Sequence, residues 1–415
     1  MASDDRQLGR TPVQLLRHDR DARVAAAATF AGFVSSGLAF ASWAARIPQI
    51  RDQLRLDPAT LGLVLLSVSA GCVTALPLTG PIVARFGSRR TVAAAAVLFG
   101  AGMAIMAAGT LAGVALVVVG LVVLGVATAA WDVAMNLHGT VLERRLGRSM
   151  MSRFHAGFSV GTVLGALIGT VMVALRVPVV VHLAAVAALI PIAVPVAARR
   201  FLADGEQVAR SRRAFAAWRE RRTVLIGLFA LAFTFAEGAG TDWISLAAID
   251  GHGFAPWAGT LAFATFLGAM TAGRWVGPGL LDRYGRVRVV RVLTITASAG
   301  ALLFVVAPGT APVFLGALLW GLGISLGFPV GISAAGEDPE HAAGRVGVIS
   351  SIGYCAFLAG PPAIGFLGAH VTVLRALLAV SVVLAVAAAA SRVVASRVHP
   401  PPPPRSWSCG DPDAA

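Results

Sequence analysis

The chain contains no lysine, only two tyrosines and only three cysteines. Without lysine, the Gly-x-x-x-x-Gly-Lys loop that cradles nucleotide phosphates cannot form, which excludes the usual domain of an ATP-driven pump. Cys72, Cys355 and Cys409 are odd in number and have no metal-binding spacing, so neither a disulfide framework nor a zinc site is indicated. The Gly-x-Ser-x-Gly pattern occurs at residues 157–161 and 323–327, but both copies lie inside apolar segments and not at a strand-to-helix turn, where a nucleophilic serine would need it. We therefore expect no enzyme, no metal and no cofactor.

Charged residues are also scarce, at 13% of 415 residues, whereas hydrophobic residues make up 57%. Soluble domains carry about 25% charged residues. Together with a mean hydropathy of +0.79, this composition excludes a disordered chain, a secreted disulfide scaffold and an ordinary soluble enzyme. A membrane-crossing helix needs about 20 apolar residues. The length then allows about twelve crossings with short loops.

Twelve apolar segments recur along the chain. In lipid such segments must be helices, because a lone strand would leave its backbone groups unpaired. The alternating pattern of barrel strands is absent. We therefore predict an all-α integral membrane protein with twelve transmembrane helices. The fifth and the sixth helix are separated from each other at residues 176–178. The predicted segments are 24–45, 60–83, 91–109, 112–136, 155–175, 177–198, 223–247, 257–281, 289–308, 311–334, 345–367 and 371–394.

The arginines indicate the orientation. If both termini are cytoplasmic, 28 of the 34 arginines lie on the inner side and five on the outer side. Inner loops of membrane proteins carry this excess. It accounts for the net charge of +14 without a nucleic-acid partner, and it predicts contact with anionic lipids at the cytoplasmic face. The basic loop 199–222 is either a helix lying on that leaflet or a plain connector.

The two halves of the chain resemble each other. Residues 84–92 and 282–290 read ARFGSRRTV and DRYGRVRVV, and Gly157-Phe158 aligns with Gly353-Tyr354. Such a repeat predicts two six-helix bundles that rock about a central site. The predicted organisation is a cytoplasmic segment 1–23, a first bundle 24–198, a basic cytoplasmic linker 199–222, a second bundle 223–394 and a proline-rich, disordered cytoplasmic tail 395–415.

The loop after the second predicted helix contains Gly80, Arg85, Gly87, Arg89 and Arg90. This spacing resembles the Gly-x-x-x-Asp-Arg-x-Gly-x-Arg-Arg signature of the major facilitator superfamily, with Ala84 in place of the usual aspartate. The second copy, Asp282-Arg283-Tyr284-Gly285-Arg286, keeps the aspartate. The resemblance covers about residues 24–394. It implies the two-bundle fold of that superfamily and a gating role for Arg85, Arg89, Arg90, Asp282, Arg283 and Arg286.

Three further stretches are similar to a poorly characterised bacterial branch that is distantly similar to sugar permeases of the fucose–proton symporter kind. They are Ser42-Trp-Ala-Ala-Arg-Ile-Pro48, Trp131-Asp-Val-Ala-Met-Asn136 and Ala272-Gly-Arg274. The resemblance implies a permease of the bacterial inner (plasma) membrane. It does not specify the solute.

Ionisable groups inside crossing segments are costly and mark a pathway by default. Asp132, Glu237 and Asp242 are candidates to carry a coupling proton, with a buried structural pair as the alternative for each. Matching depths suggest two gates, Arg46–Asp242 on the outer side and Arg274–Asp132 on the inner side. The same segments offer candidates for lining a solute cavity, namely Trp43, Asn136, Thr241 and Trp243. The two tryptophans could instead belong to an interfacial aromatic belt.

These observations predict a secondary active transporter that moves a small solute together with protons by alternating access. Two alternatives remain: a proton-coupled antiporter that exports drugs or metabolites, and a membrane sensor on a transporter fold. Its expected partners are a small-molecule solute and protons, and we expect a monomer.

Overall fold

The computed structural model describes residues 12–148, 150–203, 214–338 and 341–395. The expectations for residues 1–11, for the middle of the basic linker and for the proline-rich tail lie outside this part of the chain. The first half contains α1 (Pro12–Ala44), α2 (Ile47–Leu54), α3 (Pro58–Phe86), α4 (Ser88–Ala112), α5 (Val114–Leu146), α6 (Met151–Ala174) and α7 (Val179–Ala198).

The second half begins with the short 3₁₀ helix η1 (Ala214–Arg219). It continues with α8 (Arg221–Leu246), the π-helical turn η2 (Ala247–Gly251), α9 (Pro256–Tyr284), α10 (Arg286–Val306), α11 (Thr310–Ile324), α12 (Gly327–Ala335), α13 (Ala342–Val371), α14 (Val373–Ala376), α15 (Leu378–Ala389) and η3 (Ala390–Val394). Each predicted segment coincides with one long helix or with consecutive helices, and the predicted division at residues 176–178 is confirmed.

Several helices extend beyond the apolar runs that predicted them. In the structure α1 begins at Pro12, whereas the predicted segment begins at residue 24. Likewise α5 ends at Leu146, whereas the predicted segment ends at residue 136. An apolar run marks the part of a helix that can lie in lipid. Backbone hydrogen bonding, however, can continue the helix into water. The helices are therefore longer than the hydrophobic stretches within them.

Local chemistry fixes the ends of the helices. Pro58 occupies the first turn of α3, and the Asp57 carboxylate accepts hydrogen bonds from the backbone N–H groups of Ala59 at 2.9 Å and Thr60 at 3.1 Å. The Thr60 hydroxyl also donates to that carboxylate, and these bonds lower the pKa of Asp57. A proline in the first turn and an aspartate cap are strong helix-start signals.

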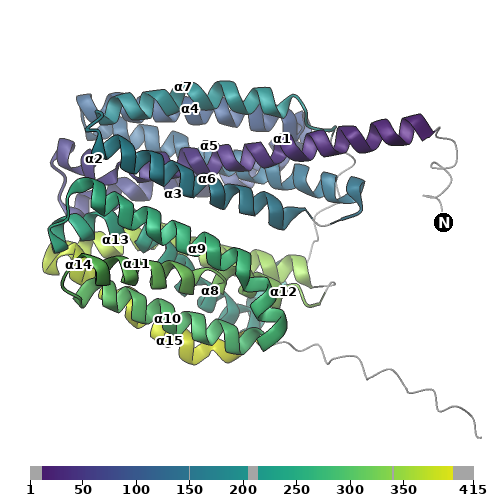
Figure 1. The fold of residues 1–415 in the computed structure, drawn as a ribbon. Helices are drawn as coiled ribbons and strands as arrows, with labels where there is room; N and C mark the ends of the chain where they lie inside the picture. The colour runs from purple at the N-terminus through teal and green to yellow at the C-terminus, as the bar shows by residue number, and fades with distance from the viewer. Residues whose placement is uncertain (1–11, 149, 204–213, 339–340, 396–415) are drawn as a thin grey trace, which may run out of the picture.

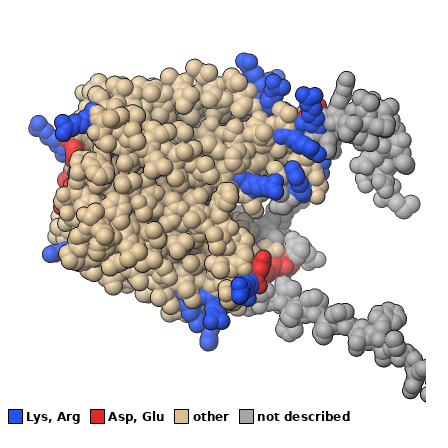
Figure 2. Space-filling view, viewed as in Figure 1, with Lys and Arg blue, Asp and Glu red and all other residues tan. Residues whose placement is uncertain are grey.

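Eleven helical segments of the described chain are long and apolar enough to cross a membrane. The remaining long helix is α9, whose 29 residues include Arg274, Asp282 and Arg283. In the space-filling view, charged side chains gather at the two ends of the molecule and leave an uncharged band between them (Figure 2). This distribution suits a protein whose middle lies in hydrocarbon.

The helices of each half run alongside one another, and the two halves lie side by side (Figure 1). Within the first half α1 packs on α6 and α4 on α5, and within the second α8 packs on α13 and α10 on α11. The halves meet through α3 with α13 and through α6 with α9. We call the end of the molecule with α2 and α14 the α2 end, and the opposite end, where α1 starts and α12 lies, the α12 end (Figure 1).

Glycines let some of these helices approach to backbone contact. A Cβ atom on Gly161 of α6 would collide with the Val34 carbonyl oxygen of α1, and one on Gly37 of α1 would collide with the Phe158 carbonyl oxygen of α6. Small residues at such crossings allow close helix packing within membranes. The α1–α6 pair is therefore held by direct backbone approach.

Candidate functional site

A central cavity of about 340 Å³ lies between the two halves. Its walls come from α1, α3, α5 and α6 of the first half and from α8, α9 and α13 of the second. Four charged side chains line it, all from within helices that were predicted from apolar runs: Asp132, Glu237, Asp242 and Arg274. The sequence analysis above named these four residues as candidates that mark a pathway, and the structure places them around the same cavity.

Glu237 and Arg274 form an ion pair in this cavity. Nη2 of Arg274 donates to Oε1 of Glu237 at 3.1 Å and to Oε2 at 3.2 Å. The two side chains are 26% and 27% exposed, so water in the cavity still reaches both. The sequence suggested Asp132 as the partner of Arg274. That pairing is not made here, and Glu237 takes its place.

Asp132 is held by a residue of its own helix. The Asn136 side-chain amide donates to Oδ1 of Asp132 at 3.0 Å and to its backbone carbonyl at 2.9 Å. Residues four apart share a helix face. Asp132 is exposed to the cavity. Asn136 is not part of the cavity lining, although its side chain contacts Asp132. No cation pairs with Asp132 among the described residues.

Asp242 also lines the cavity, yet it makes no hydrogen bond or ion pair among the described residues. Its suggested partner, Arg46, is elsewhere engaged. Arg46 is 2% exposed, and its Nη2 donates to the backbone carbonyl of Val177 at 2.6 Å. Nε and Nη1 of Arg46 are buried and have no hydrogen-bond partner in the described part of the chain. The suggested Arg46–Asp242 gate is therefore not formed in this conformation.

The two candidate tryptophans take different positions. Trp43 lines the cavity and packs edge-on against Phe40, with ring centroids 5.8 Å apart. Trp243 is fully buried and is not part of the lining, although Thr241 is. Successive helix residues point about 100° apart. Since Asp242 faces the cavity, its neighbour Trp243 points into the protein and not toward a solute.

The sequence analysis missed several aromatic residues of the lining, among them Tyr354 and Phe357 of α13 and Phe158 of α6. The internal repeat contained a usable signal, because it aligned Gly157-Phe158 with Gly353-Tyr354. Both aligned aromatic residues line the cavity. Equivalent positions in a duplicated fold tend to occupy equivalent places around the central site.

The two halves are joined at the α2 end. Arg51 of α2 forms an ion pair with Asp250 of η2. Nearby, α3 and α13 approach so closely that a Cβ atom on Gly62 would press on the Pro361 carbonyl, and one on Gly365 would press on the Pro58 carbonyl. In the space-filling view the surface is hollowed between the halves at the α12 end (Figure 2).

The two signature loops have matching backbones. Gly87 between α3 and α4 has φ 81°, and Gly285 between α9 and α10 has φ 79°. This left-handed region favours glycine, which explains the conserved spacing within the two copies. Arg85 lies over the Phe86 ring at 5.5 Å and Arg283 over the Tyr284 ring at 5.1 Å. The side chains of Arg89, Arg90 and Asp282 are exposed.

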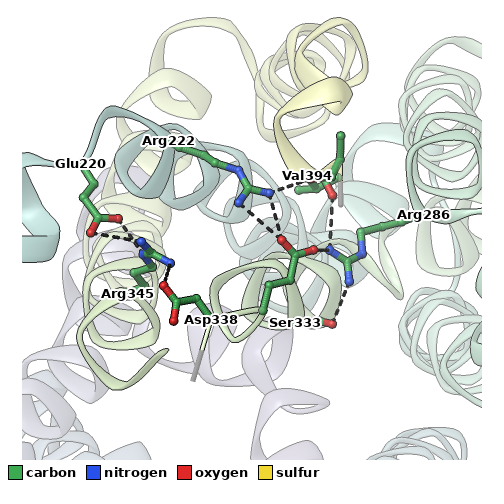
Figure 3. A network of polar contacts seen from close by, with 9 residues as sticks. Glu220, Arg222, Arg286, Ser333, Asp338, Arg345 and Val394 are labelled. Carbon is green, nitrogen blue, oxygen red and sulfur yellow. Dashed lines mark hydrogen bonds and ion pairs between the residues drawn. The ribbon is translucent and has the colours of Figure 1, made fainter. Parts of the chain in front are cut away.

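Arg286, in the second signature copy, belongs to a polar network at the α12 end (Figure 3). It donates to Glu337 at 2.6 Å and to the Ser333 hydroxyl at 3.2 Å, and Arg222 donates to the same glutamate at 3.3 Å. The Val394 carbonyl accepts a bond from Arg286. Within the second half, the network thus fastens the start of α8 and the end of η3 to the start of α10 and the end of α12.

A neighbouring group joins the linker to α13 (Figure 3). Arg345 donates to the Glu220 carboxylate at 2.7 Å and to Asp338 at 3.3 Å. The Arg345 guanidinium and the Thr223 hydroxyl hold the pKa of Glu220 below its usual value. All these partners belong to the second half or to the end of the linker. The sequence analysis singled out none of them except Arg286.

Comparison with known proteins defines the class. The family model of the Major Facilitator Superfamily matches residues 28–349, and the chain belongs to that superfamily. It is accordingly a membrane transporter and not an enzyme.

An uncharacterised MFS-type transporter of Yersinia pestis is 30% identical over 367 residues, which cover 87% of this chain and 94% of the relative. The membrane protein MosC of Rhizobium meliloti is 28% identical over 364 residues, covering 86% of this chain and 87% of MosC. These relatives span nearly the whole transporter.

Solved structures agree on the fold. The nucleoside transporter NupG superposes with a TM-score of 0.71 over 88% of this chain and 98% of its own, at 16% identity. The transporter FucP in its outward conformation gives 0.65 over 91% and 100%, also at 16% identity. An inward-facing bacterial homologue of the human lysosomal transporter Spinster gives 0.73 over 89% and 96%, at 12% identity. The architecture is therefore the two-bundle fold of this superfamily.

Proposed function

We propose that this protein is a secondary active transporter that carries a small solute across the bacterial inner (plasma) membrane together with protons. The observation that carries this proposal is the set of acidic side chains in the central cavity, Asp132, Glu237 and Asp242. Acidic groups at the interface of two rocking bundles are suited to loading a proton on one side and releasing it on the other.

The orientation follows from the arginines. With both termini and the linker in the cytoplasm, the α12 end faces inward and carries most of the positive charge, where anionic lipids lie. The α2 end then faces outward. Its Arg51–Asp250 pair and the close α3–α13 approach support an outward-closed state. The bundles are residues 24–198 and 223–394, and the transport unit is a monomer.

Asp132 is the strongest candidate for the coupling proton. Its carboxylate is exposed to the cavity, is oriented by Asn136 and has no cationic partner among the described residues. Glu237 differs because Arg274 neutralises it. We assign Glu237 and Arg274 to a charge pair that responds to proton or solute binding.

The signature arginines are assigned to gating. Arg85 and Arg283 lie at matching loops, and Arg286 is anchored to Glu337 in this conformation. A contact made in only one state biases the equilibrium between states. Arg89, Arg90 and Asp282 lie at the same loops, and Arg46 is buried at the other end of α1. Nε and Nη1 of Arg46, which have no hydrogen-bond partner among the described residues, are free to bind one in another state.

Antiport is the second candidate, because acidic side chains outnumber basic ones in the cavity by three to one. Such an excess also attracts a cationic solute, and a cation that competes with protons for one carboxylate is exported by exchange. Symport stands first because the cavity offers more than one carboxylate. Among the solved relatives, FucP is described as a fucose:proton symporter and NupG as a nucleoside transporter. Their solutes are polar.

Purified protein in proteoliposomes with an internal pH dye tests this proposal. Sugars, amino acids, organic acids and cationic compounds are added outside one class at a time. Inward proton movement with one inward-moving solute supports symport, and opposite movement supports antiport. Solute movement at the same rate and extent with and without a pH gradient would contradict proton coupling. Protein-free liposomes are the control for leakage.

A further inference from the structure

The cavity has six hydroxyl side chains in its lining, of which those of Ser36 and Tyr354 donate no hydrogen bond among the described residues. Four hydroxyl side chains of its lining donate their hydrogens to backbone carbonyls: Ser69 to Phe357 at 2.8 Å, Thr128 to Leu124 at 2.8 Å, Thr162 to Ser159 at 2.7 Å and Thr241 to Glu237 at 2.8 Å. A hydroxyl that has donated its hydrogen can only accept from a solute. These four groups therefore favour a solute that brings its own donors.

The charged groups of the lining favour a cationic solute. Among the described residues of the lining, Arg274 is the only one with a cationic side chain, and Glu237 already pairs with it. Asp132 accepts an amide hydrogen from Asn136. Asp242 has no partner among the described residues. An anionic solute would meet unpaired like charges here, whereas a cationic solute would meet a counter-ion.

The remaining lining is largely apolar, and six of its residues are aromatic. Phe40 and Trp43 of α1 meet edge to face, and Tyr354 and Phe357 of α13 lie with ring centroids 6.3 Å apart. Aromatic faces attract cations, by about 0.5–2 kcal/mol per contact. They also pack against an apolar or ring-shaped body. Carboxylate and aromatic groups in one cavity suit a solute with an ammonium group on a compact apolar body.

We propose that the transported solute carries a protonated amine and that the Asp242 carboxylate receives it. This inference rests on the proposed transport function and adds the chemical class of the solute. It assigns the amine and the coupling proton to different carboxylates, Asp242 and Asp132. Proton symport of an amine therefore does not require both cations on one group.

Matched trios of compounds test the solute class directly. Each trio holds a primary amine, the alcohol of the same shape and the carboxylate of the same shape, such as tryptamine, tryptophol and indole-3-acetate. Further trios built on cycloalkyl and on phenylalkyl groups vary the apolar body. Binding to the purified protein in detergent is measured by calorimetry at pH 7. We expect at least one amine to bind tenfold or more tightly than both of its partners.

Two variants place the amine. Asp242→Asn should lower the affinity for the preferred amine at least tenfold and leave the affinity for its alcohol within about twofold. Asp242→Glu keeps the charge and should retain the preference for the amine. Asp21→Asn, on the exposed start of α1, is the control and should bind like the wild type. Each variant is first checked for helix content and a monodisperse elution profile.

The proposal is overturned if alcohols or carboxylates bind as tightly as the amines, if no trio member binds, or if Asp242→Asn keeps the preference for the amine. Proton measurements distinguish this failure from failure of the proposed function. Proton-coupled transport of a neutral or anionic solute would overturn the amine and leave coupling standing. Amine transport that is independent of the pH gradient would overturn proton coupling and leave the amine as the solute class.

Discussion

Arg51 and Asp250 join the two halves of the transporter at the α2 end. Nη2 of Arg51 donates to Oδ1 of Asp250 at 3.0 Å, and Nη1 contacts Oδ2. The carboxylate comes from the π-helical turn η2, where the backbone departs from the regular geometry of α8. Such turns often occur at functional positions. In the proposed orientation, the pair connects segments that separate when the α2 end opens.

Breaking this pair should favour the outward-open state. The side chains are 15% and 40% exposed, and exposed pairs contribute about 0.2–1 kcal/mol. Arg51→Ala should therefore raise the outward-open population about 1.4- to 5-fold. The check is the labelling rate of a cysteine placed at Ser36 in the cavity, in a cysteine-free background, with a membrane-impermeant thiol reagent added outside.

Arg375→Ala at the same end is the matched control, because Arg375 is exposed on α14. The charge swap Arg51→Asp with Asp250→Arg should return labelling toward the wild-type rate. Equal labelling of the wild type and of Arg51→Ala would show that the pair does not hold this end closed.

Removing the charge of Glu237 should destabilise the protein, because Arg274 would keep a half-buried charge without its partner. Hydrogen bonds to charged groups contribute about 1.5–3 kcal/mol. We expect Glu237→Gln to lower the thermal unfolding temperature in detergent and to abolish transport. The double variant Glu237→Gln with Arg274→Gln should recover stability without recovering transport. Arg288→Gln, exposed at the start of α10, should change neither, and an unchanged unfolding temperature for Glu237→Gln would refute the coupling.

The α1–α6 crossing should not tolerate a side chain at Gly161. A Cβ atom there would press on the Val34 carbonyl and lie 2.9 Å from the Leu38 nitrogen. Overpacking of this kind costs about 1–3 kcal/mol. Gly161→Ala should therefore lower the unfolding temperature. Gly268→Ala in α9, where a Cβ atom meets open space, should leave stability unchanged or raise it by up to about 1 kcal/mol. Equal effects of the two substitutions would contradict the packing described here.

Glu220 should give the α12 end a pH dependence on the acid side. Its folded pKa is lowered by the Arg345 guanidinium and the Thr223 hydroxyl from the usual 4.5. The stabilisation is therefore fully present above pH 4.5, the value for the unfolded chain, and is lost as the pH falls through the lower folded value. Unfolding temperatures of the wild type and Glu220→Gln should converge as the pH falls below 4.5. A constant difference between them down to pH 3 (roughly one unit below the usual value) would argue against this linkage.

The sequence predicted the crossing segments well, because the apolar runs that satisfy lipid also define helices. It also singled out Asp132, Glu237 and Arg274 as charges that mark a pathway, and the structure places all three on the lining of one cavity. The predicted pairing of Arg274 with Asp132 was wrong, because Arg274 pairs with Glu237. Depth along a helix can be counted from the sequence. Whether Glu237 or Asp132 faces Arg274, however, depends on how the helices are rotated and how the bundles pack.

The same limit explains the two tryptophans and Arg46. Trp43 and Trp243 were both candidates for lining the cavity, but of the two only Trp43 reaches it. Arg46 and Asp242 lie at similar predicted depths, yet Arg46 turns to the Val177 carbonyl. The network around Glu337 was out of reach for another reason: its members lie on separate helices, and no spacing in the sequence connects them.

The most direct test of proton coupling compares accumulation and exchange in the Asp132→Asn variant. Proteoliposomes are loaded with the solute that the pH-dye screen identifies, and counterflow is measured without a gradient, followed by uptake driven by an imposed pH gradient. We predict that the variant exchanges solute at a rate near that of the wild type but accumulates none. Accumulation equal to that of the wild type would contradict the account, because the proton would then be carried by a group other than Asp132.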